Sequence, residues 1–123
     1  MTLESKIDKV KFIEKINDKQ SLIRHRGKTC ILEIKEEDKL SQPAIFEFNS
    51  KENRLYVIIR EDVPKRIWSI VIAHEIAESI YGMGDMESEG HQYAIKCERY
   101  YAKKFASAKT RREFYLWRNK IGY

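Results

Sequence analysis

Apolar positions in the first segment of the chain follow a helical spacing. Within TLESKIDKVKFIEKI they lie three or four residues apart, separated by charged side chains, at Leu3, Ile7, Val10, Ile13 and Ile16. One face of an α-helix has this period, so the segment is predicted to form an amphipathic N-terminal helix that ends near Asn17.

The next stretches change to patterns that are typical of strands. From Thr29 to Lys35, after a turn marked by Gly27, apolar side chains occupy alternate positions. PAIFEF and RLYVIIR are two further β-rich runs, and the polar segment NSKEN joins them, which predicts an antiparallel hairpin. The sequence therefore predicts a small sheet of about three strands.

Beyond Arg60 the pattern becomes helical again. The segment from Lys65 to Tyr81 is almost continuously apolar before His74, which predicts a helix that is buried on several sides. Two further helices are predicted over about residues 86–106 and 109–120, and the stretch ASAKT separates them. A chain of 123 residues with these elements is expected to form a single α+β domain over residues 1–123.

Composition narrows the class of protein. Hydrophobic residues make up 42% of the chain and charged residues 35%, which is the mixture of a folded protein rather than a disordered one. No apolar run is long enough to span a membrane and the first residues lack a secretory signal, so a cytoplasmic protein with no membrane partner is expected. Cys30 and Cys97 show no Cys-x-x-Cys spacing, and both are predicted to be buried free thiols.

The segment HEIAE places three ionisable side chains in the most hydrophobic predicted helix. His74 and Glu78 lie one turn apart on the same helix face, where both can bind one ion. Glu75 points to the side of that pair, and a carboxylate that is not a ligand can accept a proton from water activated by a metal. The familiar form of this pattern is His-Glu-x-x-His, and here Glu78 replaces the second histidine.

A third ligand is predicted at His91. It lies 13 residues after Glu78, near the start of the next predicted helix, where an antiparallel return would bring it back to the metal. With His74, these residues form a two-histidine, one-glutamate set that suits Zn²⁺ and leaves a fourth position for water. Manganese, iron or nickel would accept the same ligands. The competing interpretation is a structural cluster in which Arg or Lys balances the charge.

Other polar side chains are assigned less direct roles. His25, in the basic segment RHRGK, is predicted to be a solvated loop residue. Glu98 is expected to be an exposed helix charge, although it lies about two turns after His91 and could orient that histidine or a substrate. Three tyrosines are predicted to be packing aromatics, one of which could donate to an oxyanion, namely Tyr81, Tyr93 and Tyr100.

Two stretches, DVPKRIWSIVIAHEIAESIYG and EGHQYAIKCERYYAKKF, resemble the core of the ImmA/IrrE-type metallopeptidases and of minimal gluzincins. In these families a helix with an Ala-His-Glu-x-x-His pattern precedes a helix that supplies a glutamate ligand from Glu-x-x-Ala. The resemblance covers roughly residues 54–106. The positions that match are Arg66, Ala73, His74, Glu75 and Ala94.

Two positions depart from the family pattern in a reciprocal way. Glu78 stands where the family has its second histidine, and His91 stands where the family has its glutamate. The resemblance implies a zincin-like α+β fold, with a small sheet on an active-site helix and a ligand helix after it. It also implies a metallopeptidase that uses Glu75 as general base, and a peptide or protein substrate that adds to an exposed strand.

Three classes of function stay open. The leading hypothesis is a small zinc-dependent metallopeptidase with ligands His74, Glu78 and His91. The second is a catalytically inactive, metal-binding regulatory or interaction module of the same fold. Substrate and oligomeric state are not predicted.

The third class is nucleic-acid binding, suggested by the segment KTRREFYLWRNK in a chain of net charge +5. Basic residues Lys109, Arg111, Arg112, Arg118 and Lys120 alternate there with aromatic ones. An amphipathic helix that docks Phe114, Leu116 or Trp117 on the core, with its basic face in water, explains the same pattern and is preferred.

Overall fold

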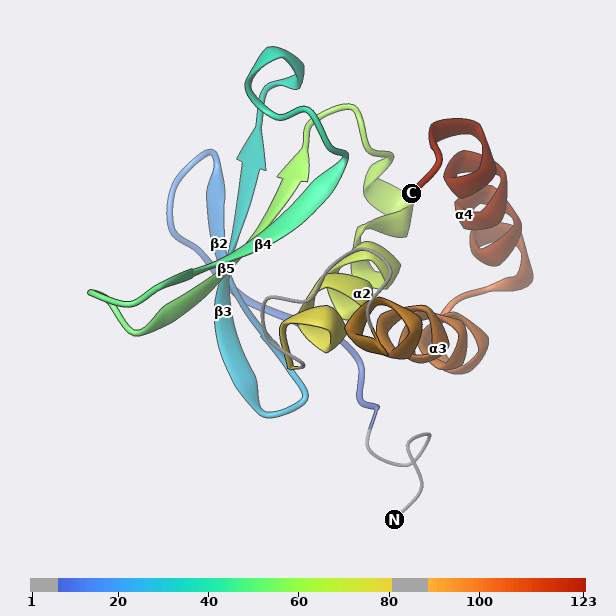
Figure 1. Cartoon of the computed structure of the whole chain (residues 1–123), viewed down its shortest axis with the longest axis horizontal. Helices are drawn as coiled ribbons and strands as arrows, with labels where there is room; N and C mark the ends of the chain where they lie inside the picture. The colour runs from blue at the N-terminus through green and yellow to red at the C-terminus, as the bar shows by residue number, and fades with distance from the viewer. Residues whose placement is uncertain (1–6, 81–88) are drawn as a thin grey trace.

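The computed structural model describes residues 7–80 and 89–123, which form one mixed sheet with helices on one side of it (Figure 1). The strands are β1 (Lys11–Lys15), β2 (Gln20–His25), β3 (Lys28–Lys35), β4 (Ala44–Asn49) and β5 (Arg54–Arg60). The helices are α2 (Trp68–Ile80), α3 (Glu89–Phe105) and α4 (Ala108–Ile121), with short 3-10 helices η1 (Glu37–Lys39) and η2 (Lys65–Ile67). The predicted α+β class is confirmed.

The sheet has the order β1-β2-β3-β5-β4 and therefore five strands rather than about three. The predicted hairpin of β4 and β5 is confirmed, and β3 pairs with β5 in parallel. β2 and β3 form a tight antiparallel hairpin through Arg26 and Gly27, whose φ angles are 54° and 74°. Two consecutive positive φ angles are typical of the type I′ turn, which matches the twist of the flanking strands.

The predicted N-terminal helix is wrong for the part of it that is described. Residues 11–15 form the edge strand β1, which pairs with β2. Ile7 and Val10 are buried just before this strand, whereas Ile13 is 50% exposed. The apolar residues of this segment thus have two different roles: Ile7 and Val10 pack in the core, and Ile13 lies in an exposed strand. Pairing with β2 therefore determines the conformation of residues 11–15, rather than the helical spacing of the sequence. Leu3 lies outside the described residues.

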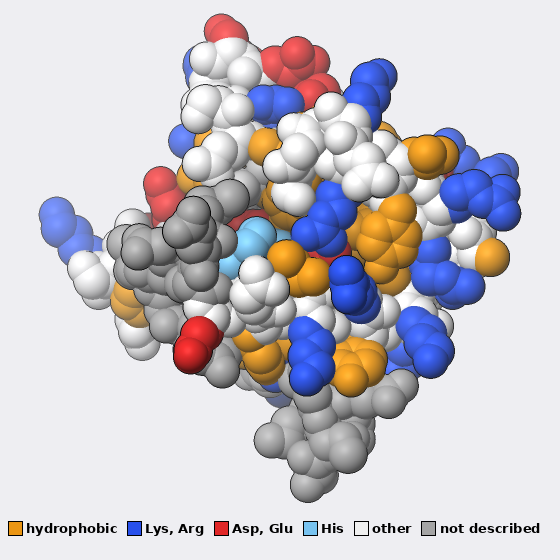
Figure 2. Space-filling model, turned by 45° about the vertical axis from the view of Figure 1, so that its right-hand side comes forward, with side chains coloured by type: hydrophobic (Ala, Val, Ile, Leu, Met, Phe, Trp, Pro, Cys, Tyr) orange, Lys and Arg blue, Asp and Glu red, His pale blue; other side chains and the backbone are white. Residues whose placement is uncertain are grey.

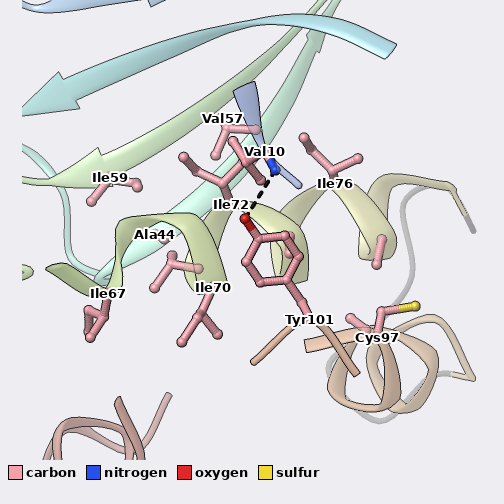
Figure 3. Packing of buried hydrophobic residues seen from close by; sticks show 14 of the residues in the cluster. Val10, Ala44, Val57, Ile59, Ile67, Ile70, Ile72, Ile76, Cys97 and Tyr101 are labelled. Carbon is pink, nitrogen blue, oxygen red and sulfur yellow. Dashed lines mark hydrogen bonds between the residues drawn. The ribbon is translucent and has the colours of Figure 1, made fainter. Parts of the chain in front are cut away.

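The main core lies between the sheet and α2. Val57 and Ile59 of β5 are buried beside α2, and Tyr101 of α3 reaches into the same cluster (Figure 3). The Tyr101 hydroxyl accepts a hydrogen bond of 3.0 Å from the Val10 backbone N–H, which ties the N-terminal segment to α3. α2 is buried from Ile70 to Ala77, as predicted, so its ionisable residues lie inside the domain.

Helix α4 docks on the core through an aromatic face. Phe114 and Trp117 are buried, which confirms the predicted docking, whereas Leu116, the third candidate, is 65% exposed. Ser107 caps the helix by accepting a hydrogen bond from the Thr110 N–H. Of the basic residues of α4, Arg111 and Arg118 are partly buried, whereas Lys109, Arg112 and Lys120 are exposed to water.

Two further predictions concern the cysteines and membranes. Cys30 and Cys97 are both buried free thiols, as predicted. Across residues 7–80 and 89–123, no helix is both long and apolar enough to cross a bilayer.

His25 is buried in β2, so the prediction of a solvated loop residue is wrong. Only 1% of the residue is exposed, and its ring meets the Tyr101 ring edge-on at 5.6 Å. Its Nδ1 lies 3.2 Å from Asp8 Oδ1 without the geometry of a hydrogen bond. Burial lowers the pKa of His25 from 6.5 to about 4, because it outweighs the attraction of the Asp8 carboxylate.

The free energy of unfolding should therefore decrease as the pH falls from 7 to 4. Unfolded His25 takes up a proton near pH 6.5, whereas folded His25 stays neutral until about pH 4. Its contribution is complete above pH 6.5 and is lost, by roughly 3 kcal/mol, as the pH falls to the folded pKa. Urea unfolding at a series of pH values measures this slope.

The matched variant is His25→Gln, which cannot titrate. Subtracting its pH profile from that of the wild type removes the contribution of the carboxylates, which also titrate near pH 4. A difference profile that is flat between pH 7 and pH 4 would show that His25 is not the source of the effect.

Candidate metal centre

Helices α2 and α3 bring the three predicted ligands together. His74 and Glu78 come from successive turns of α2, and His91 comes from the first turn of α3. Glu78 Oε2 lies 3.1 Å from His74 Nε2 and 3.3 Å from His91 Nδ1. One donor atom from each residue lies within 4.8 Å of the other two, so the three atoms are close enough together to bind one metal ion.

Glu98 holds His74 from the opposite side. Its fully buried carboxylate accepts a hydrogen bond of 2.6 Å from His74 Nδ1 through Oε1, and its Oε2 accepts one from Arg118 Nη1. An ionised carboxylate can only accept, so Nδ1 carries a proton and the ring directs Nε2 toward Glu78. This is the arrangement in which a buried carboxylate orients a metal-binding histidine.

The prediction that Glu98 is an exposed helix charge is therefore wrong. The residue is buried rather than exposed, and it contacts His74 rather than His91. The signal that locates it is the helical period of α3, because Ala94, Glu98 and Tyr101 are all buried at i, i+4 and i+7.

The helical period of α4 likewise indicates that Arg118 faces the protein interior. It lies four residues after the buried Phe114, and its side chain is only 16% exposed. Arg118 was expected on the solvated basic face of α4, but its guanidinium is directed at Glu98 inside the protein.

The carboxylate of Glu75 faces the same space as the predicted ligands. The residue is 5% exposed, and Oε2 lies 3.9 Å from His74 Nε2. The Tyr123 hydroxyl donates a hydrogen bond of 2.5 Å to this oxygen. Burial raises the pKa of Glu75 from 4.5 to about 7, although His74 and Tyr123 act in the opposite direction.

The two glutamates of α2 differ because their neighbours differ. The hydrogen bond with His74 lowers the pKa of Glu78, against the effect of partial burial, and His91 also lowers it. Burial beside the Glu75 carboxylate raises the pKa of Tyr123 well above 10, so the phenol keeps its proton. The site thus combines an ionised ligand candidate, a buried second carboxylate and a hydroxyl donor.

Tyr123 was not predicted as a site residue. Gly122 adopts a left-handed conformation (φ 79°) that ends α4, and Tyr123 follows it into the site. Its ring packs against His74 at 4.8 Å and Trp117 at 5.2 Å. The sequence shows that a glycine ends the helix, but it does not show where the following side chain points.

The tyrosines that were predicted as candidates lie elsewhere or outside the described residues. The Tyr93 hydroxyl accepts a hydrogen bond of 2.5 Å from Arg26, and Tyr100 is half-buried against the core. Tyr81 is not among the described residues. Both described tyrosines are packing residues, as predicted.

A pocket of about 250 Å³ connects these groups. It lies where α2, the start of α3, the start of β4 and the residues after α4 meet. The residues that line it are Gln42, Pro43, Ala44, His74, Glu75, Glu78, His91, Gly122 and Tyr123. Figure 2 shows histidine surface in pale blue near the centre of the view.

Comparisons of the chain with models of protein families, with curated proteins and with solved structures give no match. The interpretation of the site therefore depends on its residues and their geometry.

Replacing Glu98 should weaken metal binding without removing a ligand. In Glu98→Gln the acceptor for His74 Nδ1 loses its charge, so the histidine becomes a weaker and less well oriented ligand. We expect the affinity for Zn²⁺ to fall by about 10- to 100-fold, measured by competition with a chromophoric chelator.

Glu89→Gln is the matched control, because Glu89 is an exposed carboxylate on the same helix. The circular dichroism spectrum of each variant confirms that it is folded. Equal zinc affinity in Glu98→Gln, Glu89→Gln and the wild type would contradict the orienting role.

Proposed function

We propose that this protein is a zinc-dependent hydrolase of peptide bonds, built on a zincin-like fold. The observation that carries the proposal is that His74, Glu78 and His91 converge within 4.8 Å beside a buried carboxylate that is not one of the ligands. Two imidazoles and one carboxylate form a donor set that suits zinc. The resemblance to the ImmA/IrrE-type metallopeptidases supports the same assignment, with one histidine and one glutamate exchanged.

A structural salt-bridge cluster explains the site less well. Arg118 is already paired with Glu98, and Glu75 is bonded to a neutral phenol rather than to a cation. The pocket is lined by two glutamates, Glu75 and Glu78, and two histidines, His74 and His91. A divalent cation would offset the cost of burying these carboxylates.

Glu75 is the group placed to move the proton. A zinc ion held by the three ligands would lower the pKa of water to about 7 and polarise the substrate carbonyl. As the water oxygen bonds to the carbonyl carbon, Glu75 takes the proton that the water loses. When the carbon–nitrogen bond breaks, Glu75 delivers that proton to the leaving nitrogen.

Tyr123 is the candidate donor to the carbonyl oxygen, on which negative charge develops. Its hydroxyl is already at the pocket and is held by ring contacts with His74 and Trp117. The hydroxyl donates to Glu75 in this structure, so it would stabilise the developing charge by turning from Glu75 toward the carbonyl oxygen.

The position of β4 favours an extended substrate. β4 is an edge strand of the sheet, and Pro43 and Ala44 at its start line the pocket. An unpaired strand edge can form main-chain hydrogen bonds with an added peptide. A peptide bound there would pass beside His74 and Glu75.

Zinc binding is the first test of the proposal. The protein should bind about one zinc ion per chain, and zinc at 100 times the dissociation constant should raise the free energy of unfolding by about 2.7 kcal/mol. His91→Ala should lose most of this stabilisation, whereas Gln92→Ala, an exposed neighbour, should keep it. Metal analysis together with thermal unfolding measures both, and zinc-independent stability would refute the metal site.

Turnover is the second test. Glu75→Gln should keep zinc but lose cleavage of an unfolded polypeptide by about 10³-fold. Tyr123→Phe should lower kcat by about 10²-fold with little change in KM, because only charge that develops in the transition state is affected. Tyr115→Phe, which alters a half-buried tyrosine packed on Phe114, is the control.

These kinetics also separate the peptidase from the regulatory module. A zinc-loaded wild type that cleaves nothing, and whose properties Glu75→Gln leaves unchanged, would favour the module. A Tyr123→Phe variant as active as the wild type would remove Tyr123 from the mechanism while leaving the peptidase intact.

A further inference from the structure

Positive charge is concentrated in the last two helices. Residues 89–123 contain nine basic and three acidic side chains, so their net charge is +6. The net charge of the whole chain is +5. Seven of these basic side chains are exposed, against one acidic side chain, Glu89. Among residues 7–80 the exposed basic and acidic side chains are equal in number, with ten of each. The excess charge is therefore a property of one side of the molecule.

Helical spacing arranges six of the exposed cations in two stripes. On α3 they lie at i, i+3 and i+7, and on α4 at i, i+3 and i+11, so each set shares one face of its helix. We call these residues the basic face; they are Lys96, Arg99, Lys103, Lys109, Arg112 and Lys120. In Figure 2 the side of α3 and α4 is turned forward, and blue side chains are spread widely over it.

Two of the three carboxylates of α3 and α4 are already paired, and the third, the exposed Glu89, lies about two turns before Lys96 at the start of α3. Glu98 is buried and bonded to Arg118, and Glu113 forms an ion pair of 3.4 Å with Arg66. Arg111 also turns inward and donates to the Ala106 carbonyl at 2.7 Å. The structure thus separates the inward-facing arginines from the outward-facing cations, a division that the sequence of α4 alone does not give.

We propose that the basic face binds the phosphate backbone of nucleic acids. A series of exposed cations on two helices suits a polymer of uniform negative charge, whose binding is driven by release of counterions. Tyr100 and Tyr115 are half-exposed on the same two helices, where bases of a single strand can stack. This inference does not depend on the proposed hydrolase activity.

Two other partners fit the surface less well. Protein interfaces are depleted in lysine and depend on buried apolar anchors, whereas the basic face has four lysines and beside it on α4 only the exposed Leu116 and Ile121. A helix that lies on a membrane needs an apolar face, and the apolar face of α4, with Phe114 and Trp117, is buried in the core.

The test is fluorescence anisotropy with a labelled 20-base single strand and the matching duplex, using the full chain. We expect micromolar affinity in 50 mM salt and a loss of about 100-fold on raising the salt to 200 mM, as contact with about four phosphates implies. Lys96→Glu, Arg99→Glu and Lys103→Glu together should weaken binding in 50 mM salt by at least about tenfold and make the salt dependence less steep.

The matched control reverses three exposed lysines, Lys11 and Lys28 of the sheet and Lys51 of the turn between β4 and β5, to Glu and changes the net charge by the same amount. This variant should bind within about threefold of the wild type. If the α3 variant fails to fold, the triple reversal of Lys109, Arg112 and Lys120 tests the same face.

Three results would overturn the proposal. An equal loss of affinity in the control would show that only net charge matters. Absence of wild-type binding at 50 mM salt would exclude the interaction. Binding to vesicles that contain phosphatidylserine, with none to either nucleic acid, would identify a membrane surface as the partner.

Discussion

The contact between His74 and Glu98 is the constraint on which the candidate site depends. A histidine in the middle of a buried apolar helix needs a hydrogen-bond partner, and the Glu98 carboxylate supplies one at 2.6 Å. That carboxylate in turn needs a cation, which Arg118 provides from α4. The three helices are thus linked by one polar chain, and its inner end directs His74 Nε2 toward Glu78.

Helix α4 acts on both sides of this arrangement. Arg118 binds Glu98, which in turn holds His74, and Tyr123, just beyond the helix, contacts Glu75 in the pocket. The buried aromatic face of α4 holds both residues in place, while its outer face carries part of the basic face. The aromatic residues that pack on the core, the residues that contact the candidate site and the exposed basic residues therefore occupy separate positions of α4 and of the two residues after it.

The sequence allowed the ligand candidates to be predicted because HEIAE lies in an unusually apolar helix and His91 follows at a suitable distance. It did not reveal Tyr123, since no periodic pattern governs a residue beyond a helix cap. β1 and β2 were missed because β1 is exposed along its whole length and gains its conformation from pairing with β2. His25 was misplaced for the same reason, because the strand that buries it was not predicted.

The central claim is that His74, Glu78 and His91 hold one zinc ion together. Anomalous diffraction from zinc-loaded crystals, collected on both sides of the zinc absorption edge, tests it most directly. We predict one strong anomalous peak, at about 2.0 to 2.2 Å from His74 Nε2, a Glu78 carboxylate oxygen and a ring nitrogen of His91. A fully loaded protein whose zinc peak lies away from these three residues would contradict it.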